Sequence, residues 1–164
     1  MKHILPIITI TTLAAAASAQ TAAAPAGLSY NRVTVSRQGQ NTNLSASALL
    51  GSSNVLATIG SSTAGTSYAL GYVFKGVGAG IDATVAVSSN DTYGVILRRS
   101  LNEVVAGLEA RFVYEQSTGS TQKDSFVYEL AYNIGSKYQV AVSIQDSDVA
   151  ALDQDVSVSV RYNF

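Results

Sequence analysis

Six charged side chains stand within otherwise alternating segments, and they are the residues best placed to do chemistry. Each lies near the middle of its segment, on the parity opposite to the apolar residues. Where neighbouring segments pair as hairpins, Asp82 falls opposite Arg98 and Arg111 falls opposite Glu129. Opposite charges across a strand pair attract, most strongly in a poorly hydrated interior. The pattern predicts a salt-bridged network, with the solvated face of a soluble sheet as the alternative. Its members are Asp82, Arg98, Glu109, Arg111, Glu129 and Arg161.

The first 19 residues predict a secretory signal peptide. Lys2 and His3 precede a short apolar run that ends in Ala17-Ser18-Ala19, as in a leader with a cleavage site. The run is too short for a membrane-spanning helix. Residues 20–164 then form one mature domain, and loss of Lys2 moves the net charge from −1 to −2. A slightly acidic chain without a basic cluster is not expected to bind nucleic acid.

The mature chain lacks the side chains that most hydrolases and metal sites need. There is no Cys, and the one His is His3. Ser-His-Asp and Cys-His sites and the usual zinc ligand sets are therefore excluded. No enzymatic activity, cofactor or metal centre is expected.

One loop gathers carboxylates, in the stretch QDSDVAALDQD at 145–155. Oxygen ligands of this kind suit Ca²⁺ or Mg²⁺, although the spacing is not that of an EF-hand. The alternative is a solvated acidic loop. The candidate ligands are Asp146, Asp148, Asp153 and Asp155.

The elements that must position these residues are β-strands. Apolar residues recur with period two between clusters of Gly, Ser, Asn and Asp, a pattern of half-buried strands. A break in parity after Tyr30 suggests a bulge near Asn31-Arg32, and eight strands remain an alternative to ten. The ten predicted segments are 27–37, 42–50, 54–61, 67–75, 79–88, 92–100, 103–115, 124–134, 137–146 and 154–164.

The connections predict two different rims. Those after even-numbered segments are short, at 51–54, 75–78, 100–102 and 135–136. Those after odd-numbered segments include the two longest, 116–123 and 146–152. Transmembrane barrels have short turns on one side and longer loops on the other.

The composition of the two faces favours a barrel whose apolar side faces lipid. The chain is 47% hydrophobic and only 13% charged. Aromatic residues gather near strand ends and aliphatic residues lie between them, as in the girdles of membrane barrels. A soluble sandwich with the same face turned inward is the alternative. The predicted girdle comprises Tyr68, Tyr72, Phe74, Phe112, Tyr114, Phe126, Tyr128, Tyr132 and Tyr138.

The last segment, VSVSVRYNF, alternates up to Phe164. With the leader and the alternating strands, it resembles the small outer-membrane β-barrel proteins of Gram-negative bacteria, whose C-terminal insertion signal ends in Phe. Ser157, Ser159, Tyr162 and Phe164 match the signal, with Ser159 where Gly is usual. The resemblance implies an all-β, antiparallel up-and-down barrel in the outer membrane, in contact with lipid and lipopolysaccharide. It also implies biogenesis through periplasmic chaperones and the barrel-assembly machinery.

The resemblance leaves several functions open. The first is a porin-like or structural barrel whose narrow charged lumen passes small solutes or ions at most. The second is a barrel that binds partners through its extracellular loops. The third is a soluble secreted β-sandwich. The enzymes of this family rely on His, which the mature chain lacks.

Overall fold

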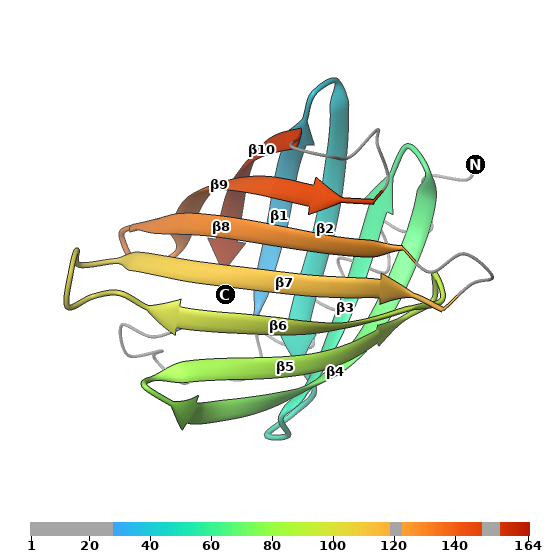
Figure 1. Cartoon of the computed structure of the whole chain (residues 1–164). Helices are drawn as coiled ribbons and strands as arrows, with labels where there is room; N and C mark the ends of the chain where they lie inside the picture. The colour runs from blue at the N-terminus through green and yellow to red at the C-terminus, as the bar shows by residue number, and fades with distance from the viewer. Residues whose placement is uncertain (1–27, 119–122, 149–154) are drawn as a thin grey trace.

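The computed structural model describes residues 28–118, 123–148 and 155–164. The predicted signal peptide and Asp153 lie outside these ranges. Within them the chain forms ten antiparallel strands that close into one barrel (Figure 1). The strands are β1 Arg32–Gln38, β2 Asn41–Leu49, β3 Val55–Ser62, β4 Gly65–Gly78, β5 Ile81–Ser88, β6 Thr92–Ser100, β7 Leu108–Ser117, β8 Asp124–Ile134, β9 Tyr138–Ser147 and β10 Asp155–Asn163. No helix in these ranges is long and apolar enough to cross a membrane.

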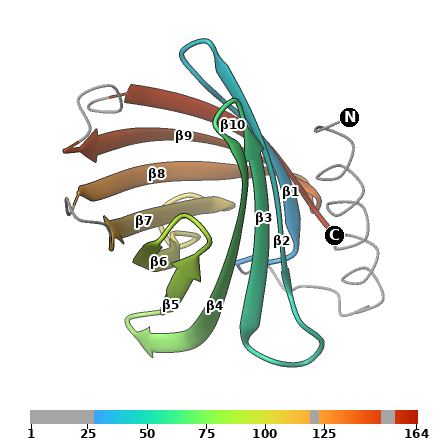
Figure 2. The same ribbon diagram turned by 90° about the vertical axis from the view of Figure 1, so that its right-hand side faces the viewer.

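The barrel closes where the first strand meets the last. β1 pairs with β10 from Arg32↔Asn163 to Gln38↔Ser157, and these strands lie side by side in Figure 2. Every other strand pairs with its neighbours in sequence, so the sheet has no free edge to aggregate. The prediction of an up-and-down barrel with ten strands is confirmed, and the eight-strand alternative and the two-sheet sandwich are wrong.

The start of β1 differs from the prediction. The strand begins at Arg32, and Leu28 and Tyr30 precede it. Their parity therefore needs no bulge. The irregularity lies instead in β4, where pairing with β5 shifts between Phe74 and Gly78. Gly76 has a φ of +64° there, a backbone conformation that glycine adopts without strain. Residues 75–78 are thus a bulged strand end, and the turn is Ala79-Gly80.

The predicted strand at 103–115 begins too early, because β7 starts at Leu108. Residues 101–107 close on themselves through local hydrogen bonds. The Val104 and Val105 amides donate to the Leu101 carbonyl at 2.9 and 3.0 Å, and the Gly107 amide donates to the Asn102 side chain at 2.7 Å. These bonds satisfy the backbone without a partner strand.

The two rims differ less than predicted. One rim, called here the loop rim, carries the connections 39–40, 63–64, 89–91, 118–123 and 148–154. The other, the terminus rim, carries 50–54, 79–80, 101–107 and 135–137 together with the start of β1 and the end of β10. The 101–107 turn is as long as the 148–154 connection, so loop length alone does not separate the rims.

Candidate functional site in the barrel lumen

The interior of the barrel is polar, and all six predicted charged residues point into it. Their parity matches that of Thr84 and Ser159, which are buried inside. The register pairs Asp82 with Arg98 and Arg111 with Glu129, as the hairpin arithmetic predicted. The side chains themselves connect differently.

Five strands contribute to a continuous chain of polar contacts, called here the plug. Arg98 donates through Nε to Glu109 at 2.7 Å. Gln139 donates to the other oxygen of Glu109 at 3.1 Å and accepts from Arg161 at 2.9 Å.

The chain continues to a second carboxylate. Arg161 also donates to Glu129, which lies 3.6 Å from Arg111. The contacts join Arg98 of β6, Glu109 and Arg111 of β7, Glu129 of β8, Gln139 of β9 and Arg161 of β10. Arg98, Glu109, Glu129, Gln139 and Arg161 are all buried, so their charges are compensated by one another rather than by bulk water.

Asp82 takes a different partner from the one that its register suggests. It accepts a 2.5 Å hydrogen bond from the Tyr30 hydroxyl and a 2.8 Å bond from the Gly76 amide. The guanidinium of Arg98 instead lies 4.7 Å from the centre of the Tyr30 ring, within cation–π range. Burial, and then the bond to Asp82, raises the pKa of Tyr30 above its ordinary value, so this phenol is a donor at neutral pH.

Sequence reasoning missed four inward side chains. Gln139 and Asn133, which share a 3.0 Å hydrogen bond, were on the correct face but are uncharged. Tyr30 and Arg32 were obscured by the expected bulge. Tyr30, Arg32 and Thr34 are spaced two residues apart, and all three line the interior. This alternation is the sequence pattern from which their inward direction could have been predicted.

Glu129 lies at the middle of β8, as predicted, whereas Asp82, Glu109 and Arg161 lie closer to the terminus rim than the predicted mid-strand positions. Asp82 and Glu109 are the second residues of their strands, and Arg161 is the third from the end of β10. Above them lies a cavity of about 360 Å³, called here the chamber. Between the charged residues at its base and those at its mouth, its walls carry small neutral side chains, with Ser36, Ser45, Thr58 and Ser143 among them. It reaches Gln38, Ser88 and Asp155 at the loop rim.

The outer wall is apolar, with aliphatic and aromatic side chains at mid-strand and further aromatic residues toward both rims. Leu70, Leu130, Val142 and Val158 are each more than half exposed. Phe112 packs against Tyr128 near the middle of β7 and β8, with ring centres 5.3 Å apart. Closer to the loop rim, Tyr114 packs against Phe126 at 5.1 Å.

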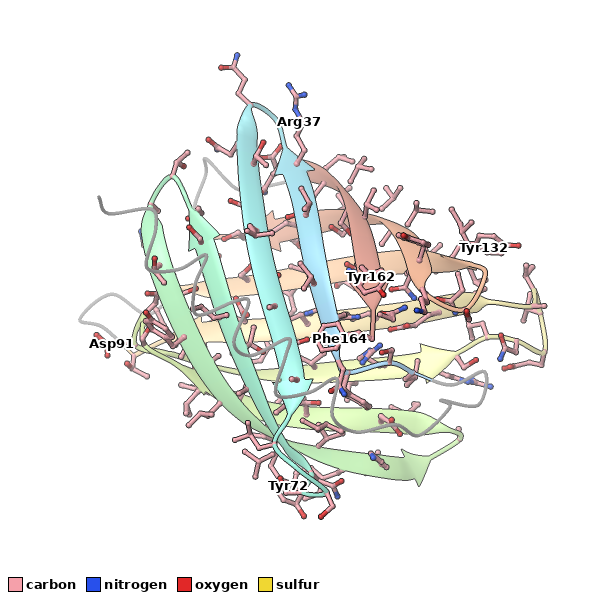
Figure 3. All side chains as sticks on the ribbon, turned by 180° about the vertical axis from the view of Figure 1, so that it is seen from behind. Arg37, Tyr72, Asp91, Tyr132, Tyr162 and Phe164 are labelled. Atoms are coloured by element: carbon pink, nitrogen blue, oxygen red, sulfur yellow. The ribbon has the colours of Figure 1, made fainter. Side chains whose placement is uncertain are left out.

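Toward the terminus rim, Tyr138 packs against Tyr162 at 5.5 Å and Tyr72 against Phe74 at 4.9 Å. Figure 3 shows Tyr72 and Tyr132 at the outer surface. The remaining residue of the predicted girdle, Tyr68, is also exposed.

The predicted cation-binding loop is not assembled in the part of the chain that the structure describes. Asp146 has the outward parity of β9, whereas Asp155 lines the chamber. Asp148 accepts from the Asp124 amide at 3.1 Å. No group of three or more acidic, His or Cys side chains among the described residues is arranged to hold a metal ion.

The residues of the expected insertion signal occupy both faces of β10. Ser157 and Ser159 line the chamber, and Tyr162 packs outside against Phe164 with ring centres 6.5 Å apart. The Phe164 amide donates to the Asn31 carbonyl at 3.1 Å, which ties the last residue to the segment before β1.

Solved structures share this fold at low sequence identity. The KdgM porin superposes with a TM-score of 0.51 at 12% identity, over 82% of this chain and 98% of that one. The NanC porin gives a TM-score of 0.47 at 12% identity, again over 82% and 98%. No protein-family model and no curated protein matches the sequence. The chain therefore has the fold of a small porin-type β-barrel.

Proposed function

We propose that this protein is an outer-membrane β-barrel, porin-like in architecture, whose lumen is narrowed by the plug. The observation that carries the proposal is the outer wall, where an exposed apolar band with further aromatic residues toward both rims surrounds a closed barrel. Eleven residues of β8 extend about 36 Å, and at a tilt of about 45° they span about 25 Å, the height of the apolar band in membrane barrels. The fold shared with the KdgM porin supports the same conclusion.

The plug limits passage through this barrel. The chamber is lined by Arg98, Arg111 and Arg161 but not by Glu109 or Gln139, which lie beyond them toward the terminus rim. The residues that line the chamber at this end are therefore the arginines, together with Glu129 and Tyr30. Barrels of about eight strands are filled by side chains and those of 16–18 carry water-filled channels, so we expect a very small conductance. No step in this function requires a catalyst.

Export and assembly are part of the same proposal. A leader at residues 1–19 directs the chain out of the cytoplasm, and the barrel-assembly machinery reads Tyr162 and Phe164 at the end of β10. Their outward position and the pairing of β10 with β1 are compatible with this role. Lipopolysaccharide and phospholipid then surround the apolar band.

The first experiment is cell fractionation with a gel-mobility assay. We expect the protein in the outer-membrane fraction, and a faster SDS-resistant band in unboiled samples. Recovery in the soluble fraction, with equal mobility before and after boiling, would contradict the proposal.

Flux through lipid vesicles tests the plug with a matched pair of variants. Arg98→Ser with Glu109→Ser removes a buried ion pair, with side chains each 4% exposed. Arg99→Ser with Glu103→Ser removes an exposed pair at the same rim, with side chains 44% and 54% exposed. We expect larger ion flux only in the first variant. Equal flux in both would show that the plug does not set the conductance.

A further inference from the structure

The arginines at the base of the chamber are not fully compensated by carboxylates. Arg98 pairs with Glu109, and Arg111 and Arg161 share Glu129. Arg32 makes no ion pair with any residue that the structure describes. Arg98, Arg111 and Arg161 all lie within Coulombic range of Arg32 and repel its charge, whereas Glu109 attracts it more weakly.

The same arginines carry buried donors without an acceptor among the described residues. These atoms are Nη1 of Arg32, Nη2 of Arg98, Nε of Arg111 and Nε of Arg161. One acceptor in the same cluster, Oε1 of Glu129, is also without a donor in the described part of the chain, so the unpaired donors there outnumber the unpaired acceptors by four to one. Two of the side chains, Arg98 and Arg161, are only 4% and 3% exposed. A buried ionic donor without a partner is unfavourable, so the arrangement calls for a negatively charged acceptor.

The chamber offers room for that acceptor. All four arginines line it, and Thr34 and Ser159 add hydroxyl groups close to Arg161. A planar guanidinium binds oxyanions through two parallel hydrogen bonds, and several guanidiniums around one cavity suit an anion with several oxygens. Glu129 and the mouth residues Glu115 and Asp155 also line the chamber, which disfavours large polyanions.

We propose that the base of the chamber binds one small oxyanion, of the phosphate, sulfate or carboxylate class, held by Arg32 together with the plug arginines. The bound anion neutralises Arg32 and strengthens the terminus-rim end of the barrel. The site lies inside the lumen, so it exists whether or not the barrel conducts.

Inorganic phosphate is the probe for the first test. The folded protein in dodecyl maltoside is melted in increasing phosphate and in sodium chloride of matched ionic strength. A ligand that binds only the folded state raises the melting temperature in a saturable way, and we expect this for phosphate beyond the effect of chloride. Identical curves in the two salts for the wild-type protein would overturn the proposal. Identical curves would not contradict the proposed outer-membrane function, because an assay in detergent does not test membrane insertion.

Two variants locate the site. Arg32→Gln removes the uncompensated charge and is expected to weaken phosphate binding about tenfold or more. Thr34→Glu places a carboxylate opposite Arg161 and two residues from Arg32 on the same face. That internal carboxylate replaces the anion, so phosphate binding is lost and the melting temperature in phosphate-free buffer rises.

The control is Arg37→Gln, because Arg37 is exposed near the β1–β2 turn and donates only to the Gly39 carbonyl at 3.2 Å among the described residues. It should bind phosphate as the wild type does. Unchanged affinity in Arg32→Gln or Thr34→Glu would overturn the assignment, and so would an equal loss in Arg37→Gln. If Arg32→Gln does not fold, Thr34→Glu and the wild-type titration decide the question.

Discussion

Glu129 is the residue whose loss most directly tests the plug. Its carboxylate accepts from Arg161 and lies 3.6 Å from Arg111, and the Glu129 and Arg161 side chains are 5% and 3% exposed. Glu129→Gln keeps the shape and one acceptor oxygen but removes the charge that both arginines share. Removing one partner of a buried ion pair costs 3–5 kcal/mol. Because the amide still accepts one hydrogen bond, we expect a loss of about 3 kcal/mol, at the lower end of that range.

The assay is urea unfolding in detergent, followed by circular dichroism because the chain has no Trp. Glu103→Gln is the matched control, since its ion pair with Arg99 is exposed and is worth at most about 1 kcal/mol. Glu129→Gln combined with Arg161→Gln should recover part of the loss, because it removes the buried charge that the single variant leaves unpaired. A loss below about 1 kcal/mol, or one equal to that of Glu103→Gln, would refute the interpretation of the plug as a buried network.

Three further substitutions test separate parts of the structure. Leu130→Arg, at an outer-wall side chain 57% exposed, should cost about 2–4 kcal/mol in lipid, whereas Val87→Arg near the loop rim should cost at most about 1 kcal/mol; equal small effects in vesicle unfolding would argue against a lipid-facing wall. Gly94→Ala places a Cβ 2.5 Å from the Tyr114 carbonyl and should cost about 1–3 kcal/mol, whereas Gly78→Ala meets no atom within 4 Å and should be near neutral by the same measurement. Tyr30→Phe loses the hydrogen bond to Asp82 and should lower the free energy of unfolding by about 1 kcal/mol. Because the pKa of Tyr30 is raised in the folded state, this difference in stability should be fully present below about pH 10 and should vanish as the pH rises through the Tyr30 pKa. A difference in stability that is independent of pH would contradict this.

The strands and their faces could be predicted from the sequence because period two is a strong signal in strands with one polar and one apolar face. The alternation in β8 and β9 places Glu129 and Ser143 inside and Leu130 and Val142 outside, and the register pairs them in that way. Hairpin register followed from short connections, which leave little freedom in pairing. Asp82 opposite Arg98 is an example.

The contacts inside the lumen could not be predicted in the same way. The register determines which Cα atoms lie opposite each other. A long side chain can nevertheless contact a residue two strands away, as Gln139 of β9 does with Glu109 of β7. Tyr30 competes for Asp82 from outside the strands. The closure of β1 against β10 brings Thr34 opposite Arg161. No local sequence pattern predicts this contact, because the two residues lie near opposite ends of the chain.

In the function that we propose, the plug both narrows the lumen and connects the strands of the wall, so conductance and stability are linked. Arg98 and Glu109 connect β6 to β7, and Gln139 and Arg161 connect β9 to β10. Glu129 joins β8 to both sides. If the plug limits passage as proposed, we expect a path through the terminus-rim end to open only when contacts among these five neighbouring strands break. Variants that conduct more should consequently unfold at lower urea, and an anion that stabilises the plug arginines should lower flux while raising the melting temperature.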